Sequence, residues 1–411
     1  MLTDTPVVGK TGKLMSLIKS RDFVLVLMSA TILAIPMPML IILGGLAGLQ
    51  LAPNDNFSTL PVSIQMLSGL FAVTPMSVFM GRAGRKPGFL VAAGFACLGG
   101  ALAAYSLISG NFVFLCVAHA LLGAAIVSFN LFRFAAADIV ATGQQATAIS
   151  ITLGSGLVAA LLAPEVFRYS KDLLAPVSLG GAYLSLSVLA LIGSIPLSIA
   201  KFAPLKPKAS VQKSIKNPAR LMERPRLIWA MVCGAGSAAG MTLLMTPTPL
   251  AMVGCGFSDV QAGDVIRWHV VAMFAPSFFT GAIINRIGAN KVVTIGAVLL
   301  ALSGISALAG VQIFNFYISL ILLGVGWNFG FVGSTALLNS ELRDQEKALF
   351  QGINDTVIAL GGTIASFSSG LLIASFSWSA IASVLIVLSV VVAISSLWQA
   401  RYKATTSFSG E

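Results

Sequence analysis

The sequence has few charged residues and almost no histidine. Only 9% of its 411 residues are charged, and 57% are hydrophobic, whereas soluble domains carry about 25% charged residues. This composition excludes an ordinary soluble domain. The four cysteines have no metal-ligand spacing and mostly lie in apolar runs, so we interpret them as packing residues and expect no metal site.

The chain also lacks the common motifs of enzymes. It has no complete Walker loop, no Ser/His/Asp set and no Cys-x-x-Cys pair. We therefore expect neither enzymatic activity nor a cofactor. No cleavable signal is evident, because the first apolar run is too long for a signal-peptide core.

What the sequence does have is a series of long apolar runs. Each is about 20 residues long, enough to cross a hydrocarbon core of about 30 Å. The pattern predicts an all-α membrane protein with twelve transmembrane helices. The expected spans cover approximately residues 23–49, 59–80, 89–108, 112–134, 146–164, 176–200, 227–253, 262–284, 292–311, 314–338, 348–374 and 378–398.

Basic residues concentrate in alternate loops. The two terminal segments, the central stretch and every second loop hold 21 of the 25 Lys and Arg residues, whereas the intervening loops hold only Arg168 and Lys171. The positive-inside rule then predicts a multi-pass protein with both termini in the cytoplasm. The net charge of +11 follows from this topology, so no nucleic-acid partner is expected.

A short basic loop after the second span recurs half a chain later. Residues 81–87 read GRAGRKP and residues 281–291 read GAIINRIGANK. In both copies an Arg-x-Gly follows the apolar run at the same distance. Such repeats are typical of transporters.

The repeat divides the chain into two pseudo-symmetric six-helix bundles. We expect the first at residues 1–200 and the second at 227–411, joined by a basic linker at 201–226. The linker holds eight basic residues against one acid, Glu223. We interpret it as a cytoplasmic segment lying near anionic lipid.

This arrangement resembles the major facilitator superfamily (MFS) over nearly the whole chain. The family's signature in the loop is approximately G-x-x-x-D-R-x-G-R-K. The matching residues are Arg82, Gly84, Arg85 and Lys86 in the first copy, and Gly281, Arg286, Gly288 and Lys291 in the second. The departures are Ser77 and Gly81, which replace the first Gly and the Asp, and Asn285, which replaces the Asp of the second copy.

The resemblance implies a monomeric secondary transporter in a bacterial inner membrane, in contact with membrane lipid. Such a protein moves a small-molecule substrate by alternating access, with a proton as the default coupling ion. The alternatives are proton-coupled efflux of drugs or metabolites, and a non-transporting relative that serves as a membrane assembly or pigment-delivery factor. The direction of transport stays open.

Acids near the repeated loops suggest latches on the cytoplasmic side. Asp138 follows the fourth span and Glu341 follows the tenth. We expect Arg82 to pair with Asp138, and Arg286 with Glu341, in an outward-open state. The alternative is that these are solvated loop charges.

Titratable groups within the spans are candidates for proton coupling, because they are costly in a membrane. Asp355 is the acid placed clearly within a span, and His269 lies about two turns into the eighth. His119 precedes Gly123 by four residues, where relatives in the resembled family often have an Arg linked to proton coupling. For His119 the alternative is a structural histidine, and for Asp355 a charge at a helix N-terminus. Asp264 and Arg267, three residues apart, are expected to form an intrahelical pair.

Uncharged polar and aromatic residues within the spans are candidates for substrate binding. They are Trp327 and Asn328 in the tenth span, Asn354 in the eleventh and Gln65 in the second. Few charges lie at mid-depth, which favours a neutral or weakly charged organic substrate. The indole and amide suit a flat heteroaromatic with polar edges, although Trp327 could instead be a packing residue.

Two short stretches narrow the resemblance. Residues 132–138 (FRFAAAD) and 326–329 (GWNF) are similar to a bacterial branch of the superfamily that includes candidate riboflavin importers. This resemblance implies riboflavin as the substrate to test first.

Overall fold

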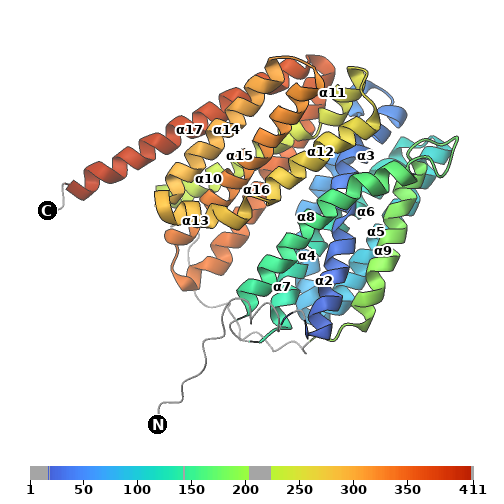
Figure 1. The fold of residues 1–411 in the computed structure, drawn as a ribbon, viewed down its shortest axis with the longest axis horizontal. Coiled ribbons are helices and arrows are strands. Elements are labelled where there is room, and N and C mark those ends of the chain that lie inside the picture. Colours follow the sequence, from blue (N-terminus) through green and yellow to red (C-terminus); the bar gives the residue numbers. More distant parts are fainter. Residues whose placement is uncertain (1–16, 18, 142–143, 203–223, 409–411) are drawn as a thin grey trace, which may run out of the picture.

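The regular secondary structure is helical throughout residues 17, 19–141, 144–202 and 224–408, the part of the chain that the computed structural model describes (Figure 1). Within these residues eleven helices are long and apolar enough to cross a membrane, and the bent pair α12–α13 brings the number of spans to twelve. The expected all-α, twelve-span architecture is confirmed.

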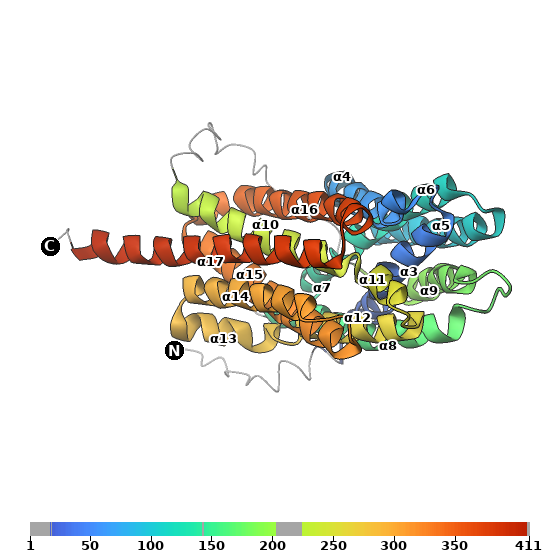
Figure 2. The same ribbon diagram turned by 90° about the horizontal axis from the view of Figure 1, so that it is seen from above.

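The helices form two bundles that lie side by side (Figures 1 and 2). The first contains α2 (Arg21–Ala34), α3 (Pro36–Leu51), the short 3₁₀ helix η1 (Asp55–Phe57), α4 (Leu60–Ala83), α5 (Arg85–Ser109), α6 (Phe112–Phe129), α7 (Phe132–Asp138), α8 (Gln145–Ser170) and α9 (Gly180–Ile199). The second contains α10 (Pro225–Met245), α11 (Thr248–Gly254), α12 (Asp259–Phe274), α13 (Ser277–Ile287), α14 (Ala289–Leu308), α15 (Ile313–Ser340), α16 (Asp344–Ser375) and α17 (Trp378–Phe408).

Prolines account for three of the interrupted spans among the described residues. Pro36, Pro247 and Pro276 lie where α2 gives way to α3, α10 to α11 and α12 to α13. A proline has no N–H to donate and clashes with the carbonyl four residues earlier, so the helix bends or breaks. The α12–α13 pair is bent by 42°.

The fifth and sixth spans show how boundaries differ from the sequence prediction. The fifth span was expected to end at Pro164, but α8 continues through it to Ser170. Membrane helices tolerate an internal proline when neighbouring groups satisfy the freed carbonyl. The sixth span was expected from Pro176, but α9 begins only at Gly180, after a series of turns.

The two copies of the basic loop have the same backbone conformation. Gly84 ends α4 with φ 108° and ψ 159°, and Gly288 ends α13 with φ 89° and ψ 149°. Both angles lie where a side chain would be strained and glycine is favoured. Each glycine turns the chain directly into the next helix, so the repeat seen in the sequence is a structural repeat.

The two ends of the spans differ in charge. We call one end the basic face. It carries Arg82, Arg85, Lys86, Lys201, Arg224, Arg226, Arg286, Lys291 and Arg343. The opposite face carries Asp55, Arg168, Lys171, Asp172 and Asp259. The bundles meet toward the opposite face, through α3, α4, α8 and η1 on one side and α11, α12 and α16 on the other, and they diverge toward the basic face (Figure 1).

Candidate functional site between the two bundles

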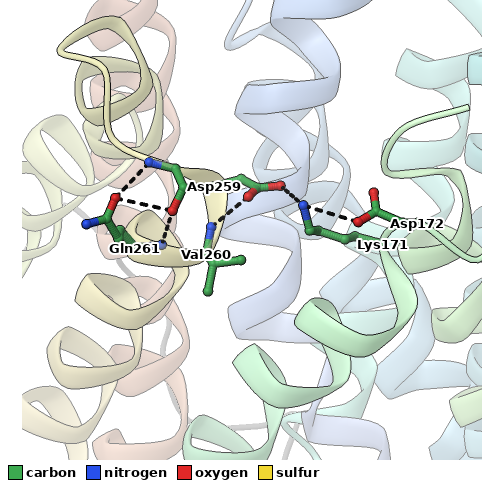
Figure 3. Close-up of polar contacts among 6 residues, drawn as sticks. Lys171, Asp172, Asp259, Val260 and Gln261 are labelled. Carbon is green, nitrogen blue, oxygen red and sulfur yellow. Dashed lines mark hydrogen bonds and ion pairs between the residues drawn. The ribbon is translucent and has the colours of Figure 1, made fainter. Parts of the chain in front are cut away.

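One ion pair joins the bundles at the opposite face. Lys171, just after α8, places its Nζ 2.8 Å from Asp259 Oδ2 at the start of α12, and 3.4 Å from Asp172 Oδ2 (Figure 3). Asp259 Oδ1 also accepts the Val260 backbone N–H at 2.8 Å. The hydrogen bond from Lys171 to Asp259 raises the pKa of Lys171 above its usual value of 10.5. The ammonium therefore stays charged at physiological pH.

A second inter-bundle ion pair lies about two turns deeper along α12. Arg267 Nη2 is 2.5 Å from Glu165 Oε1 of α8, and Arg267 Nη1 is 3.4 Å from Asp264 Oδ1. The Tyr317 hydroxyl of α15 donates to Asp264 Oδ2 at 2.5 Å. The expected intrahelical pair of Asp264 and Arg267 is present, and Arg267 also reaches the other bundle.

Uncharged contacts tighten the same interface. The hydroxyls of Ser63 in α4 and Ser366 in α16 are 2.9 Å apart and buried. Near them, a Cβ on Gly370 would come within 1.8 Å of Thr59 Oγ1, so only glycine allows α16 to approach this closely. The interface thus combines close packing with two ion pairs.

At the basic face of the first bundle, two polar contacts join helices of that bundle. Asp138 pairs with Arg85 Nε at 3.1 Å, and Lys86 Nζ donates to the Ser198 carbonyl at 2.7 Å. The expected partner of Asp138 was Arg82, which here is exposed in the last turn of α4 and forms no ion pair with a described side chain. The turn at Gly84 separates the two arginines, so that Arg85, as the first residue of α5, is the one that reaches Asp138.

The second bundle shows the same departure. Glu341 lies 3.9 Å from Arg226 Nη1, and its backbone carbonyl accepts from Arg224. Arg286, the expected partner, forms no ion pair with any side chain that the structure describes. The two arginines stand at the start of α10, beside the end of α15. The predicted latches concern an outward-open state, for which they stay predictions.

The start of α16 is fixed to α10 by Glu346. Arg224 Nη1 donates to both oxygens of Glu346 at 3.1 Å, and the Arg343 backbone N–H donates to Oε2 at 3.1 Å. These contacts, the Arg343 N–H first, lower the pKa of Glu346 below its usual value of 4.5. Among the described residues, every ion pair at the basic face lies within one bundle, whereas two ion pairs join the bundles toward the opposite face.

Trp327 belongs to an aromatic cluster near the middle of the 28-residue α15. It stacks on Phe331 with ring centroids 5.1 Å apart and an interplanar angle of 13°, and it meets Phe274 edge-on at 6.4 Å. All three side chains are only half-buried. A parallel pair of rings with exposed area can extend its stack to another flat ring.

Asn328, the neighbour of Trp327, forms hydrogen bonds to the bent span α12–α13. It is 1% exposed, and its Nδ2 lies 2.7 Å from the Met273 carbonyl and 2.6 Å from Ser277 Oγ. Its Oδ1 accepts from Thr280 Oγ1 at 2.7 Å. The amide therefore satisfies polar groups on both sides of the α12–α13 bend, which freed a carbonyl at this depth. Both of its N–H groups are engaged, so it has no donor to spare for a ligand in this state.

His119 is held from both sides within the first bundle. Its Nδ1 is 2.9 Å from Gln65 Oε1, and its Nε2 is 2.8 Å from the Tyr183 hydroxyl. Because Gln65 Oε1 can only accept, Nδ1 carries the proton and Tyr183 donates to Nε2. Both ring nitrogens are satisfied, as in a structural histidine. Gln65 is half-buried and keeps its amide N–H groups for other partners.

Only one ring nitrogen of His269, in the second bundle, has a hydrogen-bond partner among the described residues. Its Nδ1 donates to the Leu320 carbonyl at 2.7 Å, whereas Nε2 is buried without a partner among the described residues. Nε2 is therefore a free proton acceptor inside the bundle.

Asp355 lies on α16 with an exposed side chain, next to the buried Asn354, with which it interacts. Arg133 of α7, in the other bundle, is close enough to act electrostatically on Asp355 without forming an ion pair. The Arg133 guanidinium stacks on the Phe134 ring at 4.7 Å, and its Nε is buried without a described partner. The two bundles thus each contribute one of two opposite charges that act on each other.

Several of these residues were not singled out from the sequence. Glu165, Asp259 and Phe331 carry inter-bundle or aromatic contacts, yet none belongs to a motif. The sequence did contain a weak indication of the ion pairs. The loops of the opposite face hold few charged residues, and these include both acids and bases that could pair with one another.

Two pseudo-symmetric six-helix bundles, joined at one membrane face and parted at the other, define a secondary transporter. The chain belongs to the Major Facilitator Superfamily. The sequence profile of that family matches residues 232–409.

Relatives with curated sequences agree with this assignment. The chain is 35% identical to the riboflavin transporter RfnT of Brucella anthropi, over 88% of this chain and 91% of that protein. It is 27% identical to YddS and 29% identical to YdeG, two uncharacterized MFS-type transporters of Bacillus subtilis. These alignments cover 88% and 82% of this chain, and 86% and 82% of the relatives.

Solved structures share the fold at low identity. The nucleoside transporter NupG superposes with a TM-score of 0.71 at 13% identity, covering 92% of this chain and 99% of its own. The POT family transporter PepTSo also gives 0.71, at 10% identity, covering 94% and 98%. The expected MFS fold is confirmed.

Proposed function

We propose that the protein takes up riboflavin across a bacterial inner membrane, with the basic face in the cytoplasm. The observation that carries the proposal is the half-buried stack of Trp327 and Phe331 at mid-membrane depth. The similarity to RfnT, which is named a riboflavin transporter, supports the same substrate. The concentration of basic residues at one face supports the orientation.

The isoalloxazine ring of riboflavin is flat and has polar edges. Stacking of such a ring on an aromatic side chain contributes about 1–3 kcal/mol. Trp327 and Phe331 supply the parallel face and Phe274 supplies an edge. The amide N–H groups of Gln65 are suited to the ring carbonyls, and Asn354 becomes a partner if α16 moves. Asn328 acts indirectly in this proposal, by fixing the bend below Trp327.

Alternating access requires the inter-bundle contacts to exchange. In the conformation described here, Lys171 and Arg267 hold the opposite face closed through Asp259 and Glu165. Substrate enters when these pairs break, and the basic face closes in turn. We propose that Arg133 and Asp355 then approach, so that one pair of charges replaces another.

We assign proton coupling to Asp355, with His269 as a second acceptor. A carboxylate within a span costs a few kcal/mol unless it is paired, protonated or wet. Protonation of Asp355 weakens its attraction for Arg133, and the release of Arg133 opens the basic face. His119 has both nitrogens engaged and serves as a structural residue in this proposal.

The test is uptake of labelled riboflavin by a bacterial strain that can neither make nor import it. Cells expressing the wild type should accumulate riboflavin with saturable kinetics. Trp327→Ala should raise the apparent KM about tenfold, because one stacking contact is lost. The matched control is Trp268→Ala, since Trp268 is an exposed tryptophan on α12 outside the aromatic cluster.

Equal surface expression of the two variants must be shown by labelling. An unchanged KM in Trp327→Ala rejects the stacking site. No uptake by the wild type rejects riboflavin, and efflux from preloaded cells would show that transport runs in the other direction.

A further inference from the structure

A cavity of about 400 Å³ opens at the opposite face, where the last turns of α8 meet the first turns of α12 and α15. It lies apart from Trp327 and from the proposed riboflavin site. Its lining has polar and apolar surface in similar amounts and consists of Pro164, Glu165, Arg168, Val260, Gln261, Asp264, Arg267, Ile313 and Tyr317.

The cavity carries charges of both signs in equal number. Glu165 and Arg168 come from the first bundle, and Asp264 and Arg267 come from the second. The four charges sum to zero, so the net charge of the lining favours neither a simple anion nor a simple cation. A ligand with both a negative and a positive group is the best match to this lining.

Hydrogen-bond donors remain free in this lining. Arg168 is 51% exposed, and its guanidinium lies 3.9 Å from Glu165 Oε2, beyond hydrogen-bond distance. Stacking at 4.9 Å on the Tyr169 ring, with a 3.2 Å hydrogen bond to the Tyr169 hydroxyl, holds it in place. Arg267 donates to Glu165 through Nη2, and its Nη1 lies 3.4 Å from Asp264 Oδ1, which leaves N–H groups of Nη1 for a further acceptor. Two arginines thus offer N–H groups to an acceptor such as a phosphate.

The depth of the cavity points to the membrane–water interface. Exposed aromatic side chains surround this level, namely Tyr169 at the end of α8 and Phe314 at the start of α15. Aromatic residues concentrate at the interface, where lipid headgroups lie. Leu161, one turn below Glu165 on α8, is exposed and offers an apolar surface to an acyl chain.

We propose that this cavity binds the headgroup of a zwitterionic phospholipid, with its phosphate on Arg168 and Arg267 and its ammonium on Asp264 and Glu165. Phosphatidylethanolamine has this chemistry. The headgroup would touch both bundles, so it stabilises the conformation in which the opposite face is closed. The proposal goes beyond riboflavin transport, and its test needs no transport.

The experiment is native mass spectrometry of the purified full-length protein, titrated with palmitoyl-oleoyl phosphatidylethanolamine. The wild type should retain one lipid with higher affinity than any further lipid. Arg168→Gln should weaken this first binding about tenfold, because charge-assisted hydrogen bonds are lost. Arg168→Lys, which keeps the charge, should restore part of it. Lys291→Gln, an exposed basic residue at the basic face, is the matched control and should bind as the wild type does.

Two further arms identify the ligand. Palmitoyl-oleoyl phosphatidylglycerol lacks the ammonium and should bind more weakly than phosphatidylethanolamine; equal binding would overturn the zwitterion proposal. Soluble phosphoethanolamine at millimolar concentration should fail to displace the lipid; displacement would assign the cavity to a soluble ligand instead. Equal binding by wild type and Arg168→Gln, with both variants folded by thermal unfolding, would overturn the site itself.

Discussion

The ion pair between Lys171 and Asp259 gives a direct test of how the opposite face is held closed. The change is Asp259→Asn, which is nearly isosteric and keeps an oxygen to accept the Val260 N–H. The substitution therefore removes the charge while the start of α12 is preserved.

The magnitude follows from the exposure of the pair. Its atoms are 2.8 Å apart, and the Lys171 and Asp259 side chains are 20% and 22% exposed. Solvent screening at this exposure limits the net contribution to about 1 kcal/mol. That free energy corresponds to a shift of about fivefold in the ratio of open to closed molecules.

The assay is double electron–electron resonance between two spin labels at the opposite face. One label is placed on Cys255, which is exposed, and the other on a cysteine introduced at Leu173, with the remaining cysteines replaced. Asp259→Asn should increase the long-distance population about fivefold relative to the short-distance one. Asp55→Asn, an exposed acid of the same face without an ion pair to a described residue, is the control.

A double-mutant cycle separates the pair from other effects of the substitution. Lys171→Gln alone should have a similar effect, and the double variant should add little to either. If both single variants leave the distance distribution unchanged, the ion pair does not hold this face closed.

Four further outcomes are expected. Because the pKa of Lys171 is raised, its contribution to closure is present below 10.5 and is lost only as pH rises through the higher value, so distance distributions should be constant between about pH 6 and 9. Gly123→Ala should destabilise the protein by about 1–3 kcal/mol in thermal or denaturant unfolding, because its Cβ would lie 2.0 Å from a backbone carbonyl of α4; unchanged stability would contradict the packing seen here. Tyr183→Phe should cost about 1–3 kcal/mol of stability with substrate affinity unchanged, since it leaves the buried His119 Nε2 unpaired; a changed KM at wild-type stability would give His119 a functional role. Asp355→Asn should abolish uphill transport and permit exchange, measured in proteoliposomes with and without a pH gradient; normal accumulation would place coupling elsewhere.

The sequence was sufficient to predict the twelve spans, the repeat and the family. Long apolar runs indicate membrane-spanning helices directly. Both copies of the loop need a glycine with positive φ, which explains why both contain Arg-x-Gly. The fifth span was predicted too short, because Pro164 reads as a helix end in isolation and only its neighbours show that α8 continues.

The candidate site was harder to predict, because it depends on how distant segments meet. The sequence identified Trp327, but its stacking partner Phe331 is one turn away among many phenylalanines. From the sequence, Asn328 was as good a substrate-binding candidate as Trp327. In the structure its amide forms three hydrogen bonds at the α12–α13 bend instead. The pairing of Asp138 with Arg85 depends on which side of Gly84 faces α7, which spacing does not specify.

The central claim is that this transporter carries riboflavin past Trp327. The most direct measurement is counterflow of labelled riboflavin into liposomes that contain the purified protein and unlabelled riboflavin. We predict a transient, saturable accumulation of label that is reduced in Trp327→Ala and unchanged in Trp268→Ala. Accumulation no greater than in protein-free liposomes, with the wild type folded and correctly inserted, would contradict it.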